Sequence, residues 1–190
     1  DNIDVNLINE EIIDDKETIE KTPLHLAIEK NNQEIVRLLI EHPDIDVNIQ
    51  QVEETKFSFD YDDSYDDRSY KEYSGEIHIK KSPLFIAVEE NRKEIVEILL
   101  KNDTIDVNNK SYCHCSYQYS RSGYRGSSSF SSEGEGTDEK TILYKAIEIG
   151  NENTINLLLK HPKIDINLES AVIDDLDEII GLIENLKNQQ

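Results

Sequence analysis

The sequence has few of the features that mark a secreted protein or a membrane protein. It contains only two cysteines, Cys113 and Cys115, with one residue between them. Such a pair does not make a disulfide framework, which favours an intracellular, cytoplasmic location. No apolar run approaches the ~20 residues of a membrane-spanning helix, and no signal peptide is visible, so we expect no membrane insertion.

Positive charge is also scarce. The 190 residues include 20 Lys and Arg against 41 Asp and Glu, which gives a formal net charge of −21. Nucleic-acid binding needs clustered Lys and Arg, so we do not expect a nucleic acid as the partner. The acidic residues are spread through the chain, where they form either an ordinary solvated surface or a means of selecting a basic partner.

Motifs of known catalytic chemistry are missing as well. The chain has no G-x-S-x-G, P-loop, H-E-x-x-H or dinucleotide-binding pattern, so we predict no catalytic residue and no cofactor. The triplet Cys113-His114-Cys115, with His78 as a fourth group, suggests zinc. A zinc site needs two well-spaced pairs of ligands, however, and we therefore predict no metal site.

What the chain does contain is a repeated segment. Residues 21–48 read KTPLHLAIEKNNQEIVRLLIEHPDIDVN, and similar segments occupy residues 81–108 and 140–167. The apolar residues follow helical spacing, which predicts two helices in each copy. Between these helices stand residues that tolerate a left-handed turn, namely Asn31, Asn91 and Gly150. One copy is too small to bury its own apolar face, so the copies must stack.

The pattern resembles the ankyrin repeat, because Thr22-Pro23-Leu24-His25-Leu26-Ala27 matches the T-P-L-H-x-A signature of that family. The resemblance implies a mainly α fold, a solenoid of stacked helix-turn-helix pairs that forms a single domain over residues 1–190. It also implies a structural role for His25 in hydrogen bonds between adjacent repeats. The later copies carry Phe85 and Tyr144 at that position, so we expect them to be less stable.

Two long insertions, residues 49–80 and 109–139, separate the copies where the family has a short hairpin. In the first insertion, aromatic and apolar residues alternate with polar ones on both sides of an acidic turn, which predicts an extended β-hairpin finger. The second insertion is rich in Ser and Gly, and is either a second finger or a disordered loop. Insertions of this kind project from one face of a solenoid, often the binding face.

The two ends of the chain differ from the three copies. Residues 3–6 match residues 45–48, the end of a repeat, so we interpret residues 1–20 as a partial repeat with an acidic connector. The chain would then be a fragment of a larger ankyrin protein. Residues 7–20 are compatible with a short helix or an acidic loop. Residues 168–190 carry apolar residues at helical spacing, which predicts a C-terminal capping helix.

Tyrosine is concentrated in the insertions, which hold eight of the nine tyrosines. Tyrosine beside Ser and Gly is typical of contact loops, although these rings could instead pack the fingers together or lie in disordered loops. The candidate partner-binding residues of the insertions are Tyr61, Tyr65, Tyr70, Tyr73, Tyr112, Tyr117, Tyr119, Tyr124, Arg121 and Arg125. The family resemblance adds residues of the concave helical face: Glu29, Lys30, Glu89 and Glu90.

These observations predict a non-catalytic protein–protein interaction module. The solenoid would present the tyrosine-rich fingers and the concave helical face to another protein. Two alternatives belong to different classes of function. One is a structural module that self-associates through the edge strands of the fingers. The other is a regulatory or targeting domain of a larger chain that also contains an enzyme.

Overall fold

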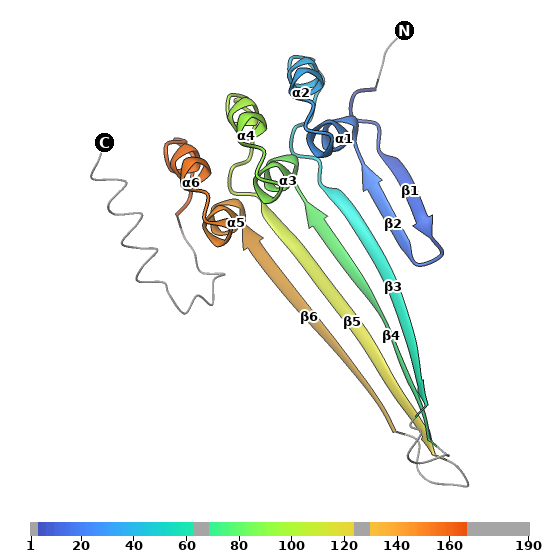
Figure 1. The fold of residues 1–190 in the computed structure, drawn as a ribbon. Helices are drawn as coiled ribbons and strands as arrows, with labels where there is room; N and C mark the ends of the chain where they lie inside the picture. Colours follow the sequence, from blue (N-terminus) through green and yellow to red (C-terminus); the bar gives the residue numbers. More distant parts are fainter. Residues whose placement is uncertain (1–3, 63–68, 124–129, 167–190) are drawn as a thin grey trace.

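The computed structural model describes residues 4–62, 69–123 and 130–166, which form three helix pairs and one antiparallel sheet. The helices stand in two rows at one end of the molecule, and the strands project from the first row (Figure 1). The first row is α1 (Pro23–Glu29), α3 (Pro83–Glu89) and α5 (Ile142–Ile149). The second row is α2 (Gln33–Ile40), α4 (Lys93–Leu99) and α6 (Glu152–Leu159). In the described ranges no helix has the length and apolar character needed to span a bilayer.

Local sequence determines where these short helices begin and end. Each helix of the first row starts after a hydroxyl residue at the N-cap position: Thr22, Ser82 and Thr141. Such residues satisfy backbone N–H groups that have no partner inside the helix. The turns within the pairs contain Asn31, Asn91 and Gly150 at φ values of 51°, 58° and 73°. The left-handed turn predicted from these residue types is therefore confirmed.

Stacking of the helix pairs creates the apolar core. In the middle pair, Ile86, Ile95 and Ile98 expose only 4%, 0% and 5% of their surface, because α1 and α2 cover them. The equivalent residues of the first pair are much more exposed: Leu26 at 38%, Ile35 at 45% and Leu38 at 63%. Full burial of such a side chain contributes about 1.5–3 kcal/mol, so contact with a neighbouring pair supplies much of the stability.

An asparagine joins each repeat to the next. The side-chain amide of Asn48 donates to the carbonyl of Thr104 at 2.9 Å, and its Oδ1 accepts from the N–H of Asp106 at 2.8 Å. Asn6 and Asn108 make the same two bonds, at 2.7 to 2.9 Å, to the loops that follow α2 and α6. Because the same two bonds recur at each step, the loop of every repeat is held in the same position relative to the repeat before it.

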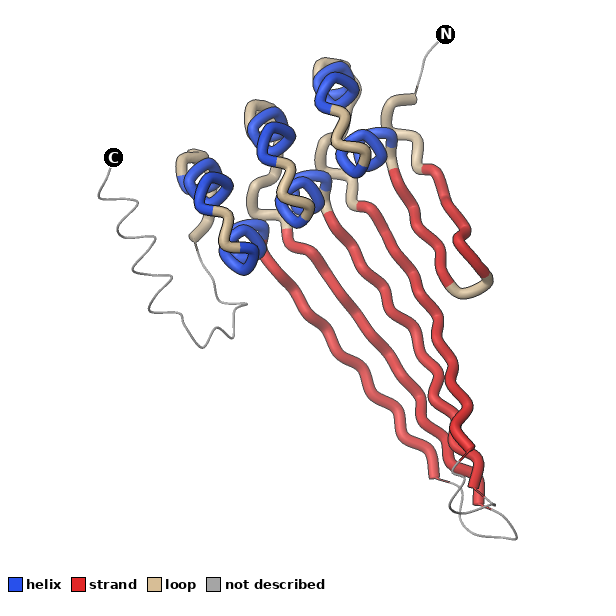
Figure 2. The backbone as a smooth tube through the Cα atoms, viewed as in Figure 1, coloured by secondary structure: helices blue, strands red, loops and turns tan. Residues whose placement is uncertain are grey.

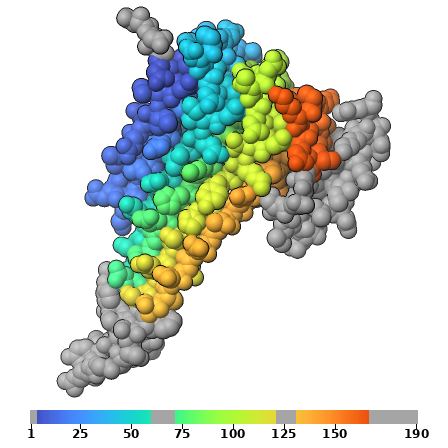
Figure 3. All heavy atoms as spheres, turned by 180° about the vertical axis from the view of Figure 1, so that it is seen from behind, coloured from blue at the N-terminus to red at the C-terminus, as the bar shows by residue number. Residues whose placement is uncertain are grey.

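The strands form one antiparallel meander in chain order: β1 (Asn9–Asp14), β2 (Glu17–Lys21), β3 (Gln51–Asp62), β4 (Ser69–Lys81), β5 (Lys110–Gly123) and β6 (Phe130–Thr141). Strands β3 and β4 belong to the first insertion, and β5 and β6 to the second. Strand β4 also pairs with β5 along almost its whole length, from Ser69–Gly123 to Lys80–Tyr112. The two insertions therefore form one continuous sheet and not two separate fingers (Figures 2 and 3).

The prediction of a mainly α fold is wrong, because strand residues outnumber helical residues. The helices have seven or eight residues each, whereas β3 to β6 have 12 to 14. Pairing between the two insertions favours this high strand content, because two strand edges that meet satisfy each other's backbone hydrogen-bonding groups. Residues 7–20 also contribute the hairpin of β1 and β2, which neither alternative for that segment included. The expected capping helix at residues 168–190 lies outside the described residues.

His25 lies fully buried at the start of α1. Its Nδ1 accepts a hydrogen bond from the backbone N–H of Thr22 at 3.1 Å and lies 2.8 Å from the Thr22 hydroxyl. Burial lowers the pKa of His25 from 6.5 to about 4; the backbone of Ile49 opposes this fall, and the charge of Lys21 adds to it. The ring is therefore neutral at pH 7, and its Nδ1 fixes the chain at the cap of α1.

Replacing Asn48 with Ala should lower the free energy of unfolding by about 1–2 kcal/mol, because two backbone groups of the next repeat lose their partner. Urea unfolding followed by circular dichroism measures the change. The matched control is Asn153→Ala, since Asn153 is an exposed asparagine of α6. Equal stability of the two variants would contradict the role of Asn48 as a link between repeats.

The buried His25 should make the fold sensitive to acid. Its pKa is lower in the folded state than in the unfolded state, so its contribution is complete above pH 6.5 and is lost as the pH falls to about 4. The total loss should be about 3 kcal/mol. We expect urea unfolding to show a smaller loss of stability over this pH range for His25→Phe than for the natural chain. An identical pH profile of the two proteins would contradict this assignment.

Candidate protein-binding surface

The alternation of the long strands separates their side chains into two faces with different chemistry. The register places one set on what we call the aromatic face: Phe57, Phe59, Tyr73, Ile77, Ile79, Cys113, Cys115, Tyr117 and Tyr119. The opposite side, the polar face, carries Glu54, Lys56, Glu76, His78, His114, Gln118, Glu133 and Glu135. A one-residue slip of any strand would move its rings to the polar face, so the register defines the surface.

A row of alternating aromatic and glycine residues crosses the middle of the aromatic face. Phe57, Gly75, Tyr117 and Gly134 lie opposite one another on β3, β4, β5 and β6. The ring of Phe57 occupies the space above Gly75, and the ring of Tyr117 occupies the space above Gly134. A Cβ atom at either glycine would collide with the ring. The glycines therefore provide the room in which both rings pack on a neighbouring strand.

The next row toward the end of the sheet is exposed and also aromatic. Phe59 stacks on Phe57 with ring centroids 5.8 Å apart, and Tyr73 lies 4.6 Å from Tyr119. Phe59, Tyr73 and Tyr117 expose 63%, 43% and 47% of their surface. Neither this row nor the ring–glycine row contains a charged residue, although the chain has a net charge of −21. An exposed apolar patch on an otherwise highly charged protein is typical of an interaction site.

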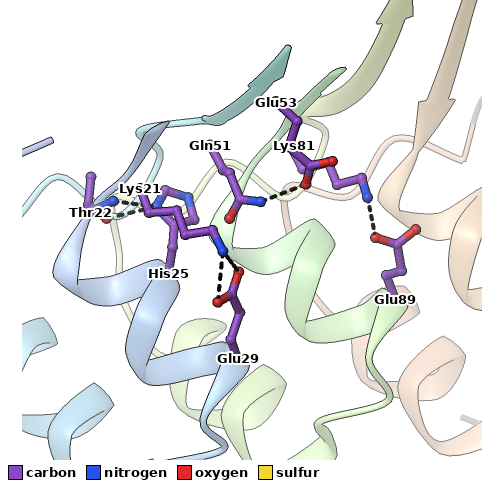
Figure 4. A network of polar contacts seen from close by, with 8 residues as sticks. All are labelled: Lys21, Thr22, His25, Glu29, Gln51, Glu53, Lys81 and Glu89. Atoms are coloured by element: carbon purple, nitrogen blue, oxygen red, sulfur yellow. Dashed lines mark hydrogen bonds and ion pairs between the residues drawn. The ribbon is translucent and has the colours of Figure 1, made fainter. Parts of the chain in front are cut away.

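Ion pairs tie the base of the sheet to the helices of the first row. A lysine at the end of a strand meets a glutamate at the end of the following helix in all three repeats: Lys21–Glu29 at 2.8 Å, Lys81–Glu89 at 2.8 Å and Lys140–Glu148 at 3.1 Å. Figure 4 shows the first two pairs on the same side of the sheet. Strand alternation assigns these lysines to the aromatic face, so this face and the ends of α1, α3 and α5 form one corner-shaped surface.

The third pair is part of a small charge network. Glu148 accepts from Lys145 at 2.9 Å and from Lys140 at 3.1 Å, and these hydrogen bonds lower the pKa of Glu148. Lys145 also lies 3.5 Å from Glu89 of the preceding repeat. The network therefore connects neighbouring repeats as well as a strand and a helix. Partly exposed pairs of this kind contribute about 1 kcal/mol or less each, so they orient the parts more than they stabilise them.

The structure brings some of the predicted site residues together and separates others. Tyr73, Tyr117 and Tyr119 share the aromatic face, whereas Tyr112 lies on the polar face, with its ring 6.4 Å from that of His114. Glu29 and Glu89 are held in the ion pairs of the corner, Lys30 is exposed, and Glu90 pairs with Arg92 at 3.2 Å. The remaining predicted side chains lie outside the described part: Tyr61, Tyr65, Tyr70, Tyr124, Arg121 and Arg125.

Sequence reasoning missed part of this surface. Phe57 and Phe59 were not among the predicted site residues, although their alternation marked them as one face of a strand. Gly134 gave no signal, because it lies in the Ser- and Gly-rich insertion, where a glycine indicates a loop. Gly75 interrupts the alternation of the first insertion, where a glycine within a strand can mark the close approach of another group. The repeated Lys and Glu positions of the corner were visible in the aligned copies, and a search for charges eight residues apart would have found them.

The geometry also separates the groups of the Cys113-His114-Cys115 triplet. The two thiols lie on the aromatic face, whereas His114 lies on the polar face opposite His78, with the ring centroids 6.3 Å apart. His78 in turn contacts Glu54 at 3.2 Å. Burial, followed by the nearby Cys115 and Asp138, raises the pKa of the Cys113 thiol. Within the described ranges no three metal-ligating side chains converge.

Replacing Gly75 with Ala should disturb the ring–glycine row. The new methyl group would collide with the Phe57 ring and with the carbonyl of Ser116, at a cost of about 1–3 kcal/mol. The matched control is Gly136→Ala, where a Cβ atom meets only the Cys115 sulfur, at 3.2 Å. Thermal unfolding and near-ultraviolet circular dichroism of the tyrosines measure both changes. Equal effects of the two substitutions would contradict the packing described for this row.

Comparison with known protein families identifies the repeated architecture. A family model described as the ankyrin repeat matches residues 20–51, and one described as ankyrin repeats in three copies matches residues 76–170. The second match spans half of the chain, and the two together include every helix of the described part. No match was found among curated proteins or among solved structures. The family matches agree with the stacked helix pairs and their capped, left-handed turns, and the chain belongs to the ankyrin repeat family.

Proposed function

We propose that this chain is a non-catalytic protein-binding module whose main contact surface is the aromatic face of the sheet. Ankyrin repeats are in general modules for protein–protein interaction. The observation that carries the specific proposal is the pair of uncharged, ring-bearing rows on a chain with a net charge of −21. Aromatic side chains dominate the binding energy of protein interfaces, because they bury a large area with few rotatable bonds.

The aromatic face is held in its binding shape before a partner arrives. Phe57 and Tyr117 are confined by their neighbours over Gly75 and Gly134. The ion pairs at the corner restrain the angle between the sheet and the helices. Binding to such a surface costs little additional side-chain or loop entropy, so more of the contact energy remains as affinity.

The charged residues around the aromatic face suit a rim. Lys30 is exposed, and the ion pair between Glu90 and Arg92 leaves 33% of each side chain exposed. Glu29 and Glu89 are engaged by lysines, which reduces the uncompensated negative charge at the corner between the sheet and the helices. Charges at a rim add little affinity but guide the approach of a complementary partner. The overall negative charge therefore favours a partner with a basic region beside an apolar contact.

A pair of substitutions tests this proposal. The double variant Phe59→Ser, Tyr73→Ser removes two exposed rings of the aromatic face, and Gln118→Ser is the control on the polar face. Each protein serves as bait in a lysate of the native cells, and partners captured by the natural chain are purified for calorimetric titration. We expect the double variant to bind at least about 30-fold more weakly, as for the loss of interface hot spots, and the control to bind normally.

Circular dichroism first establishes that both variants keep the fold. Capture of the same partners with equal affinity by the natural chain and the double variant would overturn the assignment of the aromatic face. A loss caused by Gln118→Ser but not by the double variant would move the site to the polar face.

A further inference from the structure

The sheet has three open strand edges within the described residues. Strand β1 and strand β6 are the two outer strands, so each pairs on one side only. The third edge belongs to β3, which is longer than its neighbour β2. Strand β2 pairs with β3 only as far as Thr55, whereas β3 continues to Asp62. The short hairpin of β1 and β2 ends beside the upper half of β3 in Figure 1, and residues 57–62 border no other described strand on that side.

The backbone groups of this third edge point away from the sheet. The N–H of Lys56 donates to the carbonyl of Lys16 at 2.6 Å, so Lys56 faces the side of β2. Alternate residues of an antiparallel strand direct their N–H and C=O groups to the same side. Ser58 and Asp60 therefore direct their backbone groups into the open edge, while Phe57 and Phe59 direct theirs toward β4. Unpaired groups of this kind form a template for an additional strand.

The other two edges carry features that discourage pairing. Strand β1 has a register shift between Ile12 and Asp14, which interrupts regular hydrogen bonding. Strand β6 bears the exposed acidic residues Glu133, Glu135 and Asp138, and it places the small residues Ser132, Gly134 and Gly136 opposite the rings and Cys115 on the aromatic face. Bulges and charges are the usual protections of an exposed edge. The β3 edge has no register shift, the rings of Phe57 and Phe59 flank it, and its two acidic residues, Asp60 and Asp62, come only near its distal end.

We propose that residues 57–62 of β3 are a strand-addition site, which takes an extended segment of a partner protein as a further strand of the sheet. The segment alternates in character. Its apolar residues cover Phe57 and Phe59 on the aromatic face, and its polar or basic residues lie on the polar face near Lys56, Ser58 and Glu76. Main-chain bonds to Ser58 and Asp60 supply affinity, and the rings supply specificity. This inference rests on the proposed function and names the class of partner.

Charge favours a partner segment over a second copy of this chain. Two copies joined edge to edge would each bring a net charge of −21. An extended segment with lysines on alternate residues would instead neutralise part of that charge. The same mode of pairing already operates inside the molecule, where β5 adds to β4 along the full register from Ser69 to Lys80. The free part of β3 lies on the other side of the same two-stranded ribbon.

The probe is a synthetic peptide of about eight residues that alternates isoleucine with lysine or threonine, the pattern of a half-buried strand. A control peptide has the same side chains and charge but carries methyl groups on its backbone nitrogens, so it cannot donate hydrogen bonds. On the protein, Ser58→Pro removes the outward N–H while leaving the bonds between β3 and β4 in place. Its matched control is Ser58→Ala, which keeps the N–H.

We expect the natural chain and Ser58→Ala to bind the probe equally in titrations at physiological salt. Ser58→Pro should bind it at least about tenfold more weakly, and the methylated peptide should not bind. Hydrogen exchange on the natural chain should show slower exchange of the Ser58 and Asp60 amides when the probe is bound. This last measurement and the methylated peptide decide the question even if Ser58→Pro does not fold.

Other results would overturn the proposal in distinguishable ways. Absence of probe binding, or equal binding of the methylated peptide, would show that the edge does not pair. Binding that falls in Phe59→Ser but not in Ser58→Pro would leave the aromatic face as a contact surface without strand addition. A dimer in sedimentation velocity that Ser58→Pro abolishes would assign the edge to a second copy of the chain. Partner capture by the double variant of the aromatic face tests the proposed function separately, so a failure of strand addition can be distinguished from a failure of that function.

Discussion

Backbone pairing between β4 and β5 is the interaction on which the sheet half of this molecule depends. Each insertion alone is a two-stranded hairpin, which is marginally stable in water. The β4–β5 register, from Ser69–Gly123 to Lys80–Tyr112, satisfies the inner edges of both hairpins and joins them. Only then do the rings of β3 and β5 alternate with the glycines of β4 and β6 in one row. Without this ladder the aromatic face would be two separate ribbons.

The helical stack supports that ladder by holding the bases of the strands at a fixed spacing. Strands β2, β4 and β6 each lead directly into a first-row helix, and the asparagine bonds place successive repeats in equivalent positions. Lys21, Lys81 and Lys140 then tie each of these strands to the far end of its helix. The two halves are thus connected by the chain itself and by side-chain bonds, so the sheet extends from the stack in a defined direction.

The combination fits the function proposed above, in which the molecule presents a surface to another protein. Burial in the middle repeat packs neighbouring helix pairs together, and the ring–glycine row packs neighbouring strands together at the centre of the sheet. The net charge of −21 opposes the association of several molecules through such an exposed apolar patch. In the proposed strand addition, the open β3 edge beside the rings would set the direction of the partner, because hydrogen bonds from a strand edge require an extended segment.

The sequence alone determined the helix pairs, their left-handed turns and their stacking, because these depend on spacing within one repeat and on residue types such as Asn31 and Gly150. It also indicated the first hairpin through alternation. The tertiary structure decided that both insertions and residues 7–20 form one sheet, and hence that the fold is not mainly α. It also decided which rings meet which glycines, and that Glu29 and Glu89 bind lysines. The physical reason is that strand pairing uses backbone groups common to every residue, so the partner of a strand depends on where the stack places it.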